Sequence, residues 1–327
     1  MAVTLEQAKK NTQDKLSPLV IDEFRKSSFL LDHIPFDDCV AHRGGGATMT
    51  YSYTRVVTQP TAAFREINKE YTPQEAAKER YSVDLKIFGG SFQVDRVIAD
   101  MGGAANEVSF QMAQKVKAAA ALFIDTVING DSTADSKAFD GLEKALKGST
   151  TEFVPTAVID LSTSEALDQN YMAFLDALDE FLMGLDGAPD FIGGNTKLIA
   201  KIRACARRAG MYQTARNEFG QQVESYGAVP LVDLGAKPGT NDPIVPILTG
   251  SEEGQTGNGG CTSLYAVRFG LDGFHAVSPS GVLPVRQWLP DYRTSGAVKT
   301  GEVEMVAAVA LKATRAAGVM RKIKVKG

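Results

Sequence analysis

The side chains that most often do chemistry are few in this sequence and widely separated. The 327 residues include three histidines and three cysteines: His33, His42, His275, Cys39, Cys205 and Cys261. Next to a base or a metal ion, these residue types would act as general bases, nucleophiles or zinc ligands. None of them forms an HxxxH, HExxH or CxxC pattern, so we interpret the cysteines as reduced thiols and predict no metal site.

A glycine-rich stretch at residues 249–262 is the other candidate for chemistry. A loop of this kind cradles phosphate when its glycines follow GxGxxG or GxxxxGK[ST] spacing and a helix begins directly after them. Residues 254–260 read GQTGNGG and match neither spacing, so we interpret the stretch as a surface loop. The nucleophile pattern GxSxG is also absent, Asp37-Asp38 lacks a third oxygen ligand, and Trp288 is expected to be a packing anchor. We therefore predict no catalytic, cofactor-binding or metal-binding residues and no enzymatic activity.

The overall composition narrows the class of protein. Hydrophobic residues make up 44%, and Lys+Arg 35 against Asp+Glu 39 gives a net charge of −4. This balance excludes a disordered chain and disfavours a protein that mainly coats nucleic acid. No apolar run reaches membrane-spanning length, and the first 15 residues are polar, which predicts a soluble intracellular protein.

The first fifty residues do not resemble the start of a compact domain. A short polar helix is expected at residues 5–15, and a second helix follows the N-cap and first-turn pair Ser17-Pro18. That helix should end before Pro35, and a run of three glycines at residues 44–46 provides a joint. We interpret the segment as an arm that packs on another part of the assembly, with an ordinary helical hairpin as the alternative.

A strand pair with a charged tip comes next. Alternating apolar residues predict one strand from Tyr51 to Val57 and its return from Val83 to Val94. Eight of the sixteen residues 65–80 between them are charged, four of each sign. Because a two-stranded ribbon has little core of its own, we expect a neighbouring subunit to order it. A solvated hairpin is an equally open interpretation at this stage.

A long amphipathic helix follows. Asn106 is a plausible N-cap, and Val108, Met112, Val116, Ala119, Phe123 and Val127 recur on one face. Asn129-Gly130 should stop the helix, with Gly130 in a left-handed cap. We expect this helix to be the structural spine of the protein.

The middle of the chain is predicted to mix helices and short strands. Ser162 to Glu165 matches a capping box, Phe191-Ile192 should form a strand, and a helix is expected from Thr196 to Ala209, ended by Gly210. Further strands are expected at Val229–Val232 and Ile244–Leu248, and His275 is expected in a strand at a sheet edge. The C-terminal tail is rich in β-prone residues and ends in a basic alternation, which favours a strand with one solvated face over a nucleic-acid contact.

This order of parts resembles the major capsid proteins of tailed bacteriophages, whose HK-ninety-seven-like fold encapsulin shells share. The most telling stretch is 106–146, where the amphipathic helix runs into Asn129-Gly130 and then Gly141-Leu142. The resemblance implies an α+β phage major capsid protein fold with an N-terminal arm, an extended β-hairpin loop, a peripheral domain with a long spine helix, and an α/β axial domain. The arm would span 1–50 and the extended loop 51–98; the peripheral domain would hold 99–155 and 282–313, and the axial domain 156–281 and 314–327.

The resemblance also implies function and partners. The chain would assemble through hexamers and pentamers into an icosahedral shell around double-stranded DNA, and it would form in the host cytoplasm and reside in the virion. The expected intersubunit contacts are the charged residues of the loop: Arg65, Glu66, Lys69, Glu70, Lys78, Glu79 and Arg80. Expected partners are other copies of the chain, a separate scaffolding protein, a portal protein, possibly a decoration protein, and packaged DNA through non-specific contact, with no membrane and no cofactor.

Two departures from relatives and two alternative functions complete the expectations. Some relatives carry a scaffolding segment before the arm, whereas here the arm begins almost at Met1, so we expect either a separate scaffolding protein or a mature form that already lacks the segment. Lysines occur at Lys69, Lys78 and Lys86, but no asparagine follows Asn258, which makes a Lys–Asn cross-link between subunits doubtful. An encapsulin-type cargo shell is the first alternative, and an α/β enzyme with its site in the 249–262 loop is the second.

Overall fold

The computed structural model describes residues 29–40, 48–101, 107–210, 213–216, 222–248, 259–280 and 285–327. The helix expected at residues 5–15, the beginning of the second expected helix, the glycine joint 44–46, the proposed cap Asn106 and most of the 249–262 loop lie outside these ranges, whereas a helix at Phe29–His33 occupies the place where the second expected helix should end. Over the described residues, helices and strands mix as expected for an α+β protein.

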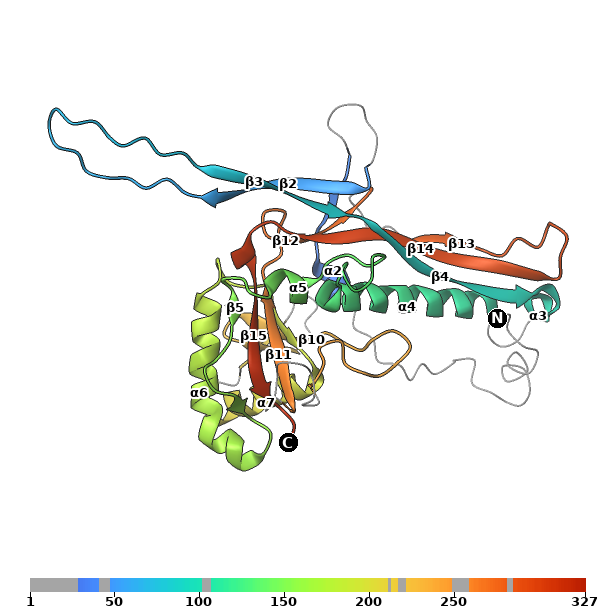
Figure 1. Cartoon of the computed structure of the whole chain (residues 1–327). Helices are drawn as coiled ribbons and strands as arrows, with labels where there is room; N and C mark the ends of the chain where they lie inside the picture. The colour runs from blue at the N-terminus through green and yellow to red at the C-terminus, as the bar shows by residue number, and fades with distance from the viewer. Residues whose placement is uncertain are drawn as a thin grey trace.

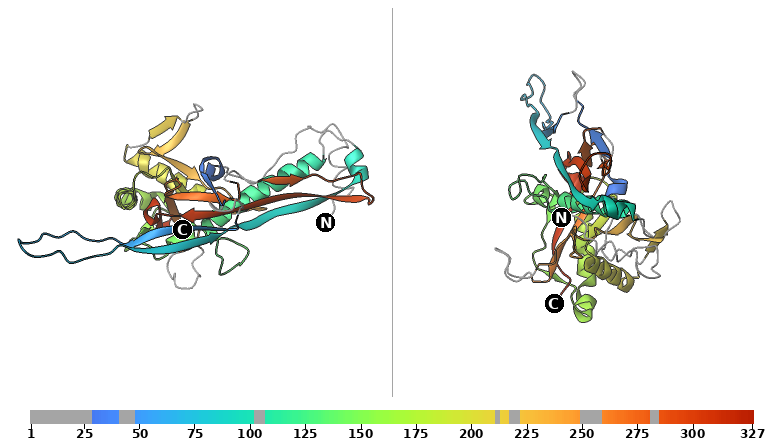
Figure 2. Two further views of the ribbon diagram at one scale, coloured as in Figure 1. Left: turned by 90° about the horizontal axis from the view of Figure 1, so that it is seen from above. Right: turned by 90° about the vertical axis from the view of Figure 1, so that its right-hand side faces the viewer.

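The molecule consists of an elongated wing, a thicker body and a ribbon that projects past the body (Figure 1). The wing is one long sheet backed by a helix, and Figure 2 shows that the ribbon and the wing extend in opposite directions. No helix of the described part has the length and apolar character that crossing a membrane requires.

The wing is built around β14 (Val298–Leu311), the longest strand. It belongs to a five-stranded sheet in which β1 (Phe36–Asp38) pairs with β12 (Phe274–Ser278), and β12 pairs with one end of β14. β13 (Arg286–Trp288) and β4 (Lys86–Asp95) also pair with β14, and β4 lies on the side of β14 opposite β13. β4 runs antiparallel to β14, from Asp95 opposite Val298 to Lys86 opposite Ala307. The wing thus joins segments that lie some 200 residues apart in sequence.

The spine helix is α4 (Glu107–Asn129), and it lies along the wing sheet. Four of the residues expected on its apolar face, Met112, Ala119, Phe123 and Val127, are buried, which confirms the predicted face. Met112 and Ala119 pack against Phe92 of β4 and other residues of the wing sheet. The short helix α3 (Arg96–Asp100) connects β4 to the segment before α4, and Asp95 caps it.

Gly130 follows α4 because the site has no room for a side chain. The prediction that Gly130 adopts a left-handed cap conformation was wrong. Its φ is not positive. A Cβ at Gly130 would lie 2.2 Å from the carbonyl oxygen of Phe139, and a Cβ at Gly141 would lie 2.5 Å from that of Thr126. The Gly141 amide donates to the Gly130 carbonyl at 2.8 Å, and α5 (Leu142–Leu146) begins there. The two glycines therefore allow one backbone to pack directly on another.

The predicted return strand divides into two at Leu85. β2 (Thr50–Thr58) pairs with β3 (Ala77–Asp84), whereas Ile87, Phe92 and Val94 belong to β4 and pair with β14. Leu85 is buried at the junction, where its amide donates to the Met49 carbonyl. The projecting ribbon is consequently β2, β3 and residues 59–76.

The body holds an eight-stranded sheet in the order β5–β15–β11–β7–β10–β9–β8, with β6 also pairing with β15. Its strands are β5 (Glu152–Phe153), β6 (Ile159–Asp160), β7 (Phe191–Gly194), β8 (Gln213–Arg216), β9 (Gln222–Tyr226), β10 (Val229–Asp233), β11 (Cys261–Val267) and β15 (Ala317–Lys324). Helices α6 (Ser164–Met183) and α7 (Thr196–Arg208) share one hydrophobic cluster with this sheet. The short 3-10 helix η1 (Thr314–Ala316) links β14 to β15.

Several local predictions were confirmed and others shifted. The N-cap of α6 is Thr163, one residue later than the capping box placed it, and its side chain accepts from the Ala166 amide. Gly210 ends α7 with a φ of +70°, as expected for a helix stop.

Residues 244–248, predicted as a strand, form none. The carbonyls of Ile244 and Val245 instead accept from the amide side chains of Asn129 and Asn195, which removes the need for a sheet partner.

Two further predictions were wrong because they concern non-local pairing. His275 lies on β12, which has β1 on one side and β14 on the other, so it is in the sheet interior and not at an edge. Trp288 is half exposed on β13, because that strand is an outer strand of the wing sheet, and it does not anchor the core.

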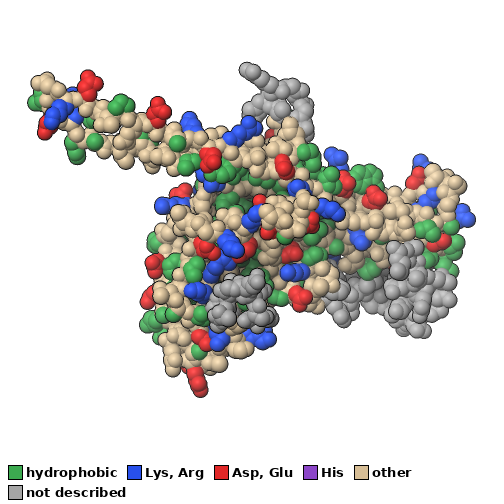
Figure 3. All heavy atoms as spheres, in the orientation of Figure 1, with side chains coloured by type: hydrophobic (Ala, Val, Ile, Leu, Met, Phe, Trp, Pro, Cys, Tyr) green, Lys and Arg blue, Asp and Glu red, His purple; other side chains and the backbone are tan. Residues whose placement is uncertain are grey.

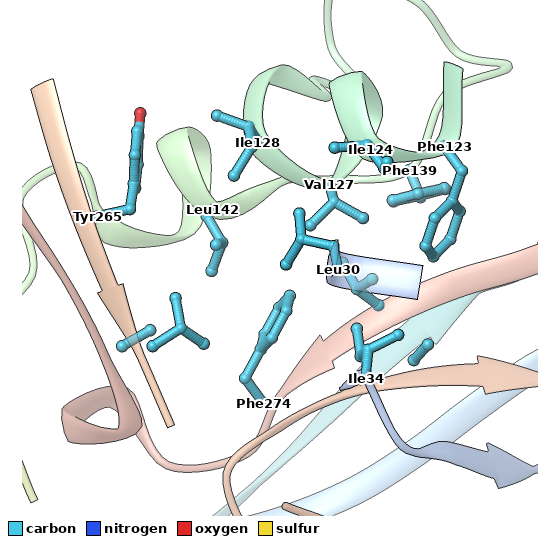
Figure 4. Packing of buried hydrophobic residues seen from close by; sticks show 14 of the residues in the cluster. Leu30, Ile34, Phe123, Ile124, Val127, Ile128, Phe139, Leu142, Tyr265 and Phe274 are labelled. Atoms are coloured by element: carbon cyan, nitrogen blue, oxygen red, sulfur yellow. The ribbon is translucent and has the colours of Figure 1, made fainter. Parts of the chain in front are cut away.

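One hydrophobic cluster joins all parts of the molecule. Figure 4 shows Phe123, Ile124 and Val127 of α4 facing Phe274 of β12, with Leu30 between them. Leu30 comes from α2 (Phe29–His33), so the end of the expected arm segment contributes a buried side chain to the core. The root of the wing and the body therefore share a common core.

Candidate subunit interface

The ribbon formed by β2, β3 and residues 59–76 is the part of the molecule with the least support from its own chain. Every residue from 56 to 80 is exposed, and Figure 1 shows the ribbon extending well beyond the body. A two-stranded ribbon without a hydrophobic face against other structure is marginal in water. This ribbon therefore depends on something outside the single chain for a fixed conformation.

The root of the ribbon, in contrast, is firmly attached. Arg55 donates to the carbonyls of Leu311 and Lys312 at 2.7 and 2.9 Å, and its guanidinium lies 4.6 Å from the ring centre of Tyr81. Tyr53 donates to the Leu311 carbonyl at 3.0 Å. These contacts hold the ribbon on the end of β14, so its direction is set while its far end is unsupported.

The tip of the ribbon presents apolar side chains to solvent. Phe64 and Ile67 have relative exposures of 107% and 88%, and Tyr71 is also exposed. Figure 3 shows hydrophobic and charged side chains interspersed along the projecting end. Exposed aromatic and aliphatic side chains in this setting are typical of interaction surfaces. Phe64 and Ile67 are not among the predicted contact residues, because the charged side chains around them dominate the sequence pattern.

The charged residues expected to contact a neighbour are partly engaged within the ribbon. Lys69 and Glu66 form an ion pair at 2.5 Å. The Arg65 guanidinium donates to the Lys69 carbonyl at 3.2 Å and lies 5.6 Å from the Tyr71 ring centre, so it shapes the tip.

On β3 the remaining charges divide in the same way. Arg80 donates to the Ser52 hydroxyl at 3.1 Å, and Glu79 accepts from the Tyr81 hydroxyl at 2.8 Å. The side chains of Glu70 and Lys78 have no hydrogen bond or ion pair to any residue that the structure describes. All seven predicted contact residues therefore lie on the ribbon. Five of them contact other residues of the ribbon, whereas Glu70 and Lys78 form no hydrogen bond or ion pair with the described residues.

The relative size of these effects favours the apolar tip as the source of binding energy. An exposed ion pair contributes at most about 1 kcal/mol, because water screens it and two long side chains must be ordered. Burial of a Phe or Ile side chain contributes about 1.5–3 kcal/mol. If a partner covers the tip, Phe64 and Ile67 would therefore supply more attraction than the charge pairs, whose expected role is register and partner choice.

Several titratable groups away from the ribbon are buried. All three cysteines are unpaired, in line with the prediction of reduced thiols, and burial raises the pKa of the Cys39 and Cys205 thiols to about 11. His275 is fully buried, which lowers its pKa to about 4. Among the described residues, no group of three or more His, Cys, Asp or Glu side chains is arranged to hold a metal ion.

The basic tail contains the strand β15, which confirms the prediction of a strand, and two of its basic side chains are paired within the chain. On β15, Arg321 forms ion pairs with Glu143 and Glu152, and Lys324 pairs with Asp160 at 3.2 Å. Ile323 between them is fully buried. These ion pairs connect β15 to α5 and to the neighbouring strands β5 and β6 of the same sheet.

Comparisons with known proteins are informative at the level of structure alone. No protein-family model and no curated protein sequence matches this chain. The holo-SrpI encapsulin complex of Synechococcus elongatus is similar with a TM-score of 0.64 and 16% identity, over 100% of this chain and 98% of that chain. The capsid of a native GTA particle is similar with a TM-score of 0.60 and 13% identity, over 99% of both chains. The capsid of Myoviridae phage XM1 is similar with a TM-score of 0.56 and 10% identity, over 95% of this chain and 97% of that chain.

These likenesses span nearly the whole length of each chain, so they concern the complete arrangement of ribbon, wing and body. The identities are low enough that they establish architecture and nothing finer. The chain has the HK-ninety-seven-like fold that the capsid proteins of tailed phages share with an encapsulin shell protein.

Proposed function

We propose that this chain is a major capsid protein of a tailed bacteriophage, which assembles through hexamers and pentamers into an icosahedral shell around double-stranded DNA. Its role would be structural and not enzymatic. The shell-forming part of the proposal is supported by the fold, since the similar structures are capsids and an encapsulin. The choice of a phage genome as the content is the finer part of the proposal.

The single observation that carries the shell-forming role is the ribbon with its attached root and unsupported tip. A chain that functioned alone would gain nothing from exposing every residue from 56 to 80, with Phe64 and Ile67 at the end. A second copy that covers the tip removes this apolar surface from water. If the ribbon covers a different part of the neighbouring copy, the contact is heterologous, which is the kind of contact that builds rings when the rotation between copies closes.

The proposal includes a division of labour along the chain. Residues 1–50 would be the arm, 51–98 the extended loop, 99–155 and 282–313 the peripheral domain, and 156–281 and 314–327 the axial domain. The sheets add detail: β4 pairs within the wing although it falls inside 51–98, and β12 does so although it falls inside 156–281. Arg65, Glu66, Lys69, Glu70, Lys78, Glu79 and Arg80 would align the ribbon on its neighbour.

Partners follow from the same proposal. The shell would form in the host cytoplasm and become part of the virion, with a separate scaffolding protein, a portal protein and a decoration protein as its partners. Packaged DNA would be contacted non-specifically. The net charge of −4 suits an inner wall that does not grip DNA strongly.

Electron microscopy of the expressed protein, alone and with candidate scaffolding proteins, tests the proposal. Closed shells, or free hexamers and pentamers, are expected. Deletion of residues 69–78 should leave soluble subunits or capsomers that do not close into shells. A uniform small oligomer under all conditions would contradict the proposal.

An encapsulin-type cargo shell is the second candidate, and the likeness to the encapsulin of Synechococcus elongatus favours it. The two functions differ in content. Nuclease-protected double-stranded DNA in particles purified from the native host supports the phage capsid, whereas a co-purifying protein inside DNA-free particles supports the cargo shell.

A further inference from the structure

The two long helices of the body carry charges of opposite sign. Helix α6 (Ser164–Met183) has five acidic residues and no basic one, whereas α7 (Thr196–Arg208) has five basic residues and no acidic one. Such complete segregation over two neighbouring helices is a feature of this chain that the ribbon does not explain.

Part of this charge is neutralised inside the chain. Arg208 of α7 pairs with Asp168 of α6, and Arg203 pairs with Glu224. Asp179 accepts from the Tyr226 hydroxyl at 2.7 Å, and Lys201 donates to the Ser162 carbonyl at 2.7 Å. These interactions fasten α6 and α7 to each other and to the surrounding body.

A second set of charged side chains on α6 and α7 takes no part in these interactions. The side chains of Asp176 and Glu180 on α6, and of Lys197 and Arg207 on α7, are exposed and form no hydrogen bond or ion pair with the described residues. On both helices they point away from the buried face. The body therefore displays one acidic and one basic surface, and these four side chains have no hydrogen-bond or ion-pair partner among the residues that the structure describes.

The acidic surface also has an apolar component. Met172 and Met183 have exposures of 58% and 88%, and with Asp176 and Glu180 they recur at steps of four, four and three residues, which places all four on one stripe of α6. Figure 3 shows acidic and hydrophobic side chains along the edge of the body that α6 forms. Exposed methionines beside charges are typical of a protein interface and not of a solvated helix face.

We propose that the α6 stripe of one subunit docks on the exposed basic face of α7 of the next copy of this chain. Charge complementarity identifies the occupant, because the surface that matches the α6 stripe is present on every other copy. The contact is heterologous, so it repeats around a ring and orients successive bodies head to tail. The inference rests on the proposed shell function and names a contact between the bodies in addition to the ribbon.

Charge reversal tests the contact. Three variants are needed: Asp176→Lys with Glu180→Lys, Lys197→Glu with Arg207→Glu, and the four changes combined. They are compared with the unaltered protein under conditions in which that protein forms rings or shells, and far-UV circular dichroism verifies their folding. Either pair alone should lower the yield of rings and shells about tenfold or more at low salt, because like charges then face each other. The combined variant has the original net charge and restores opposite signs, so its yield should recover.

Mixing the two paired variants gives a sharper readout. In a one-to-one mixture each contact is attractive only when the two variants alternate around a ring. Alternation closes with six members and fails with five, so electron microscopy should show hexamers, few pentamers and no closed shells. An isolated effect on folding, or charge pairing within one subunit, predicts no recovery in the mixture.

The outcomes separate this contact from the shell function itself. Normal assembly of either reversed pair, or no recovery in the folded combined variant, would overturn the α6–α7 contact while shells of the unaltered protein sustain the proposed function. Failure of the unaltered protein to form rings or shells with any scaffolding partner would overturn both. Recovery in the mixture with hexamers only would support both.

Discussion

The apolar tip of the ribbon provides the most direct test of how the subunits hold together. We consider replacement of Phe64 and Ile67 by serine. Both side chains are fully or almost fully exposed in the single chain, so their removal should leave the free energy of unfolding of the subunit unchanged within about 0.5 kcal/mol. Any effect on assembly then reports a contact with another copy.

The expected size follows from burial. If a neighbour covers both side chains, assembly loses about 1.5–3 kcal/mol for each, or about 3–6 kcal/mol per subunit. At 1.4 kcal/mol per factor of ten, a loss of only 3 kcal/mol raises the protein concentration needed for assembly by about a hundredfold. The matched control replaces Glu66 and Lys69 by glutamine, which removes the exposed ion pair at the same tip. Its effect should be about 1 kcal/mol or less, or roughly fivefold.

Sedimentation velocity over a range of protein concentrations measures both changes, since free subunits, capsomers and shells sediment separately. The serine variant should shift the onset of assembly far more than the glutamine variant does. Normal assembly of the serine variant would refute the idea that the tip is buried against a neighbour. A large defect in the glutamine variant alone would show that charge pairs, and not apolar burial, hold the ribbon in place.

Three further predictions concern the stability of the subunit. Gly130→Ala should lower the free energy of unfolding, measured in urea, by about 3 kcal/mol, because its Cβ would lie 2.2 Å from the Phe139 carbonyl oxygen. The control Gly90→Ala should leave it nearly unchanged, because the added Cβ would meet only the flexible Lys115 side chain, at 3.4 Å. The pKa of His275 is about 4 in the folded chain, whereas its ordinary value is 6.5, so as the pH falls the unfolded chain takes up a proton on this side chain before the folded chain does. The free energy of unfolding should therefore have its full value above pH 6.5 and fall by about 3 kcal/mol as the pH approaches 4. Urea titrations of the unaltered protein and His275→Leu across this range should diverge in slope, and parallel curves would exclude the buried histidine as the cause. Arg321→Met should destabilise the body by about 2–3 kcal/mol in thermal unfolding, since it leaves two carboxylates without their cation; a loss below about 0.5 kcal/mol would mean that water compensates them fully.

Much of the architecture could be predicted from local patterns. The apolar periodicity of residues 108–127 identified the spine helix and its buried face, and the order of ribbon, spine and mixed middle indicated the fold. Apolar periodicity predicts these elements because each of them buries one face. The residues of that face recur every 3.6 positions in a helix and every 2 positions in a strand. The helix stop at Gly210 could be predicted for the same reason, because its left-handed conformation is a local property.

Features that depend on non-local pairing could not be predicted. The division of the ribbon's return strand at Leu85 depends on β14, some 200 residues later, which pairs with β4 and leaves β3 to β2. His275 lies in the sheet interior because β1 covers the strand that was expected to be an edge.

The candidate interface divides in the same way between sequence and tertiary structure. The charged run at residues 65–80 was visible in the sequence, as was its position at the end of a ribbon. The folded tip decides that the apolar side chains of Phe64 and Ile67 are almost fully exposed there. It also decides that Arg65, Glu66 and Lys69 contact one another.

The sequence by itself determined the elements, their buried faces and their order along the chain, because these follow from local periodicity and capping. Only the tertiary structure decided which strands meet, which glycines permit close packing, and which polar and apolar side chains remain without a partner. The physical reason is that burial and pairing are properties of contacts between distant segments. For a chain that presents its surfaces to other copies, those unsatisfied side chains are also where the proposed function resides.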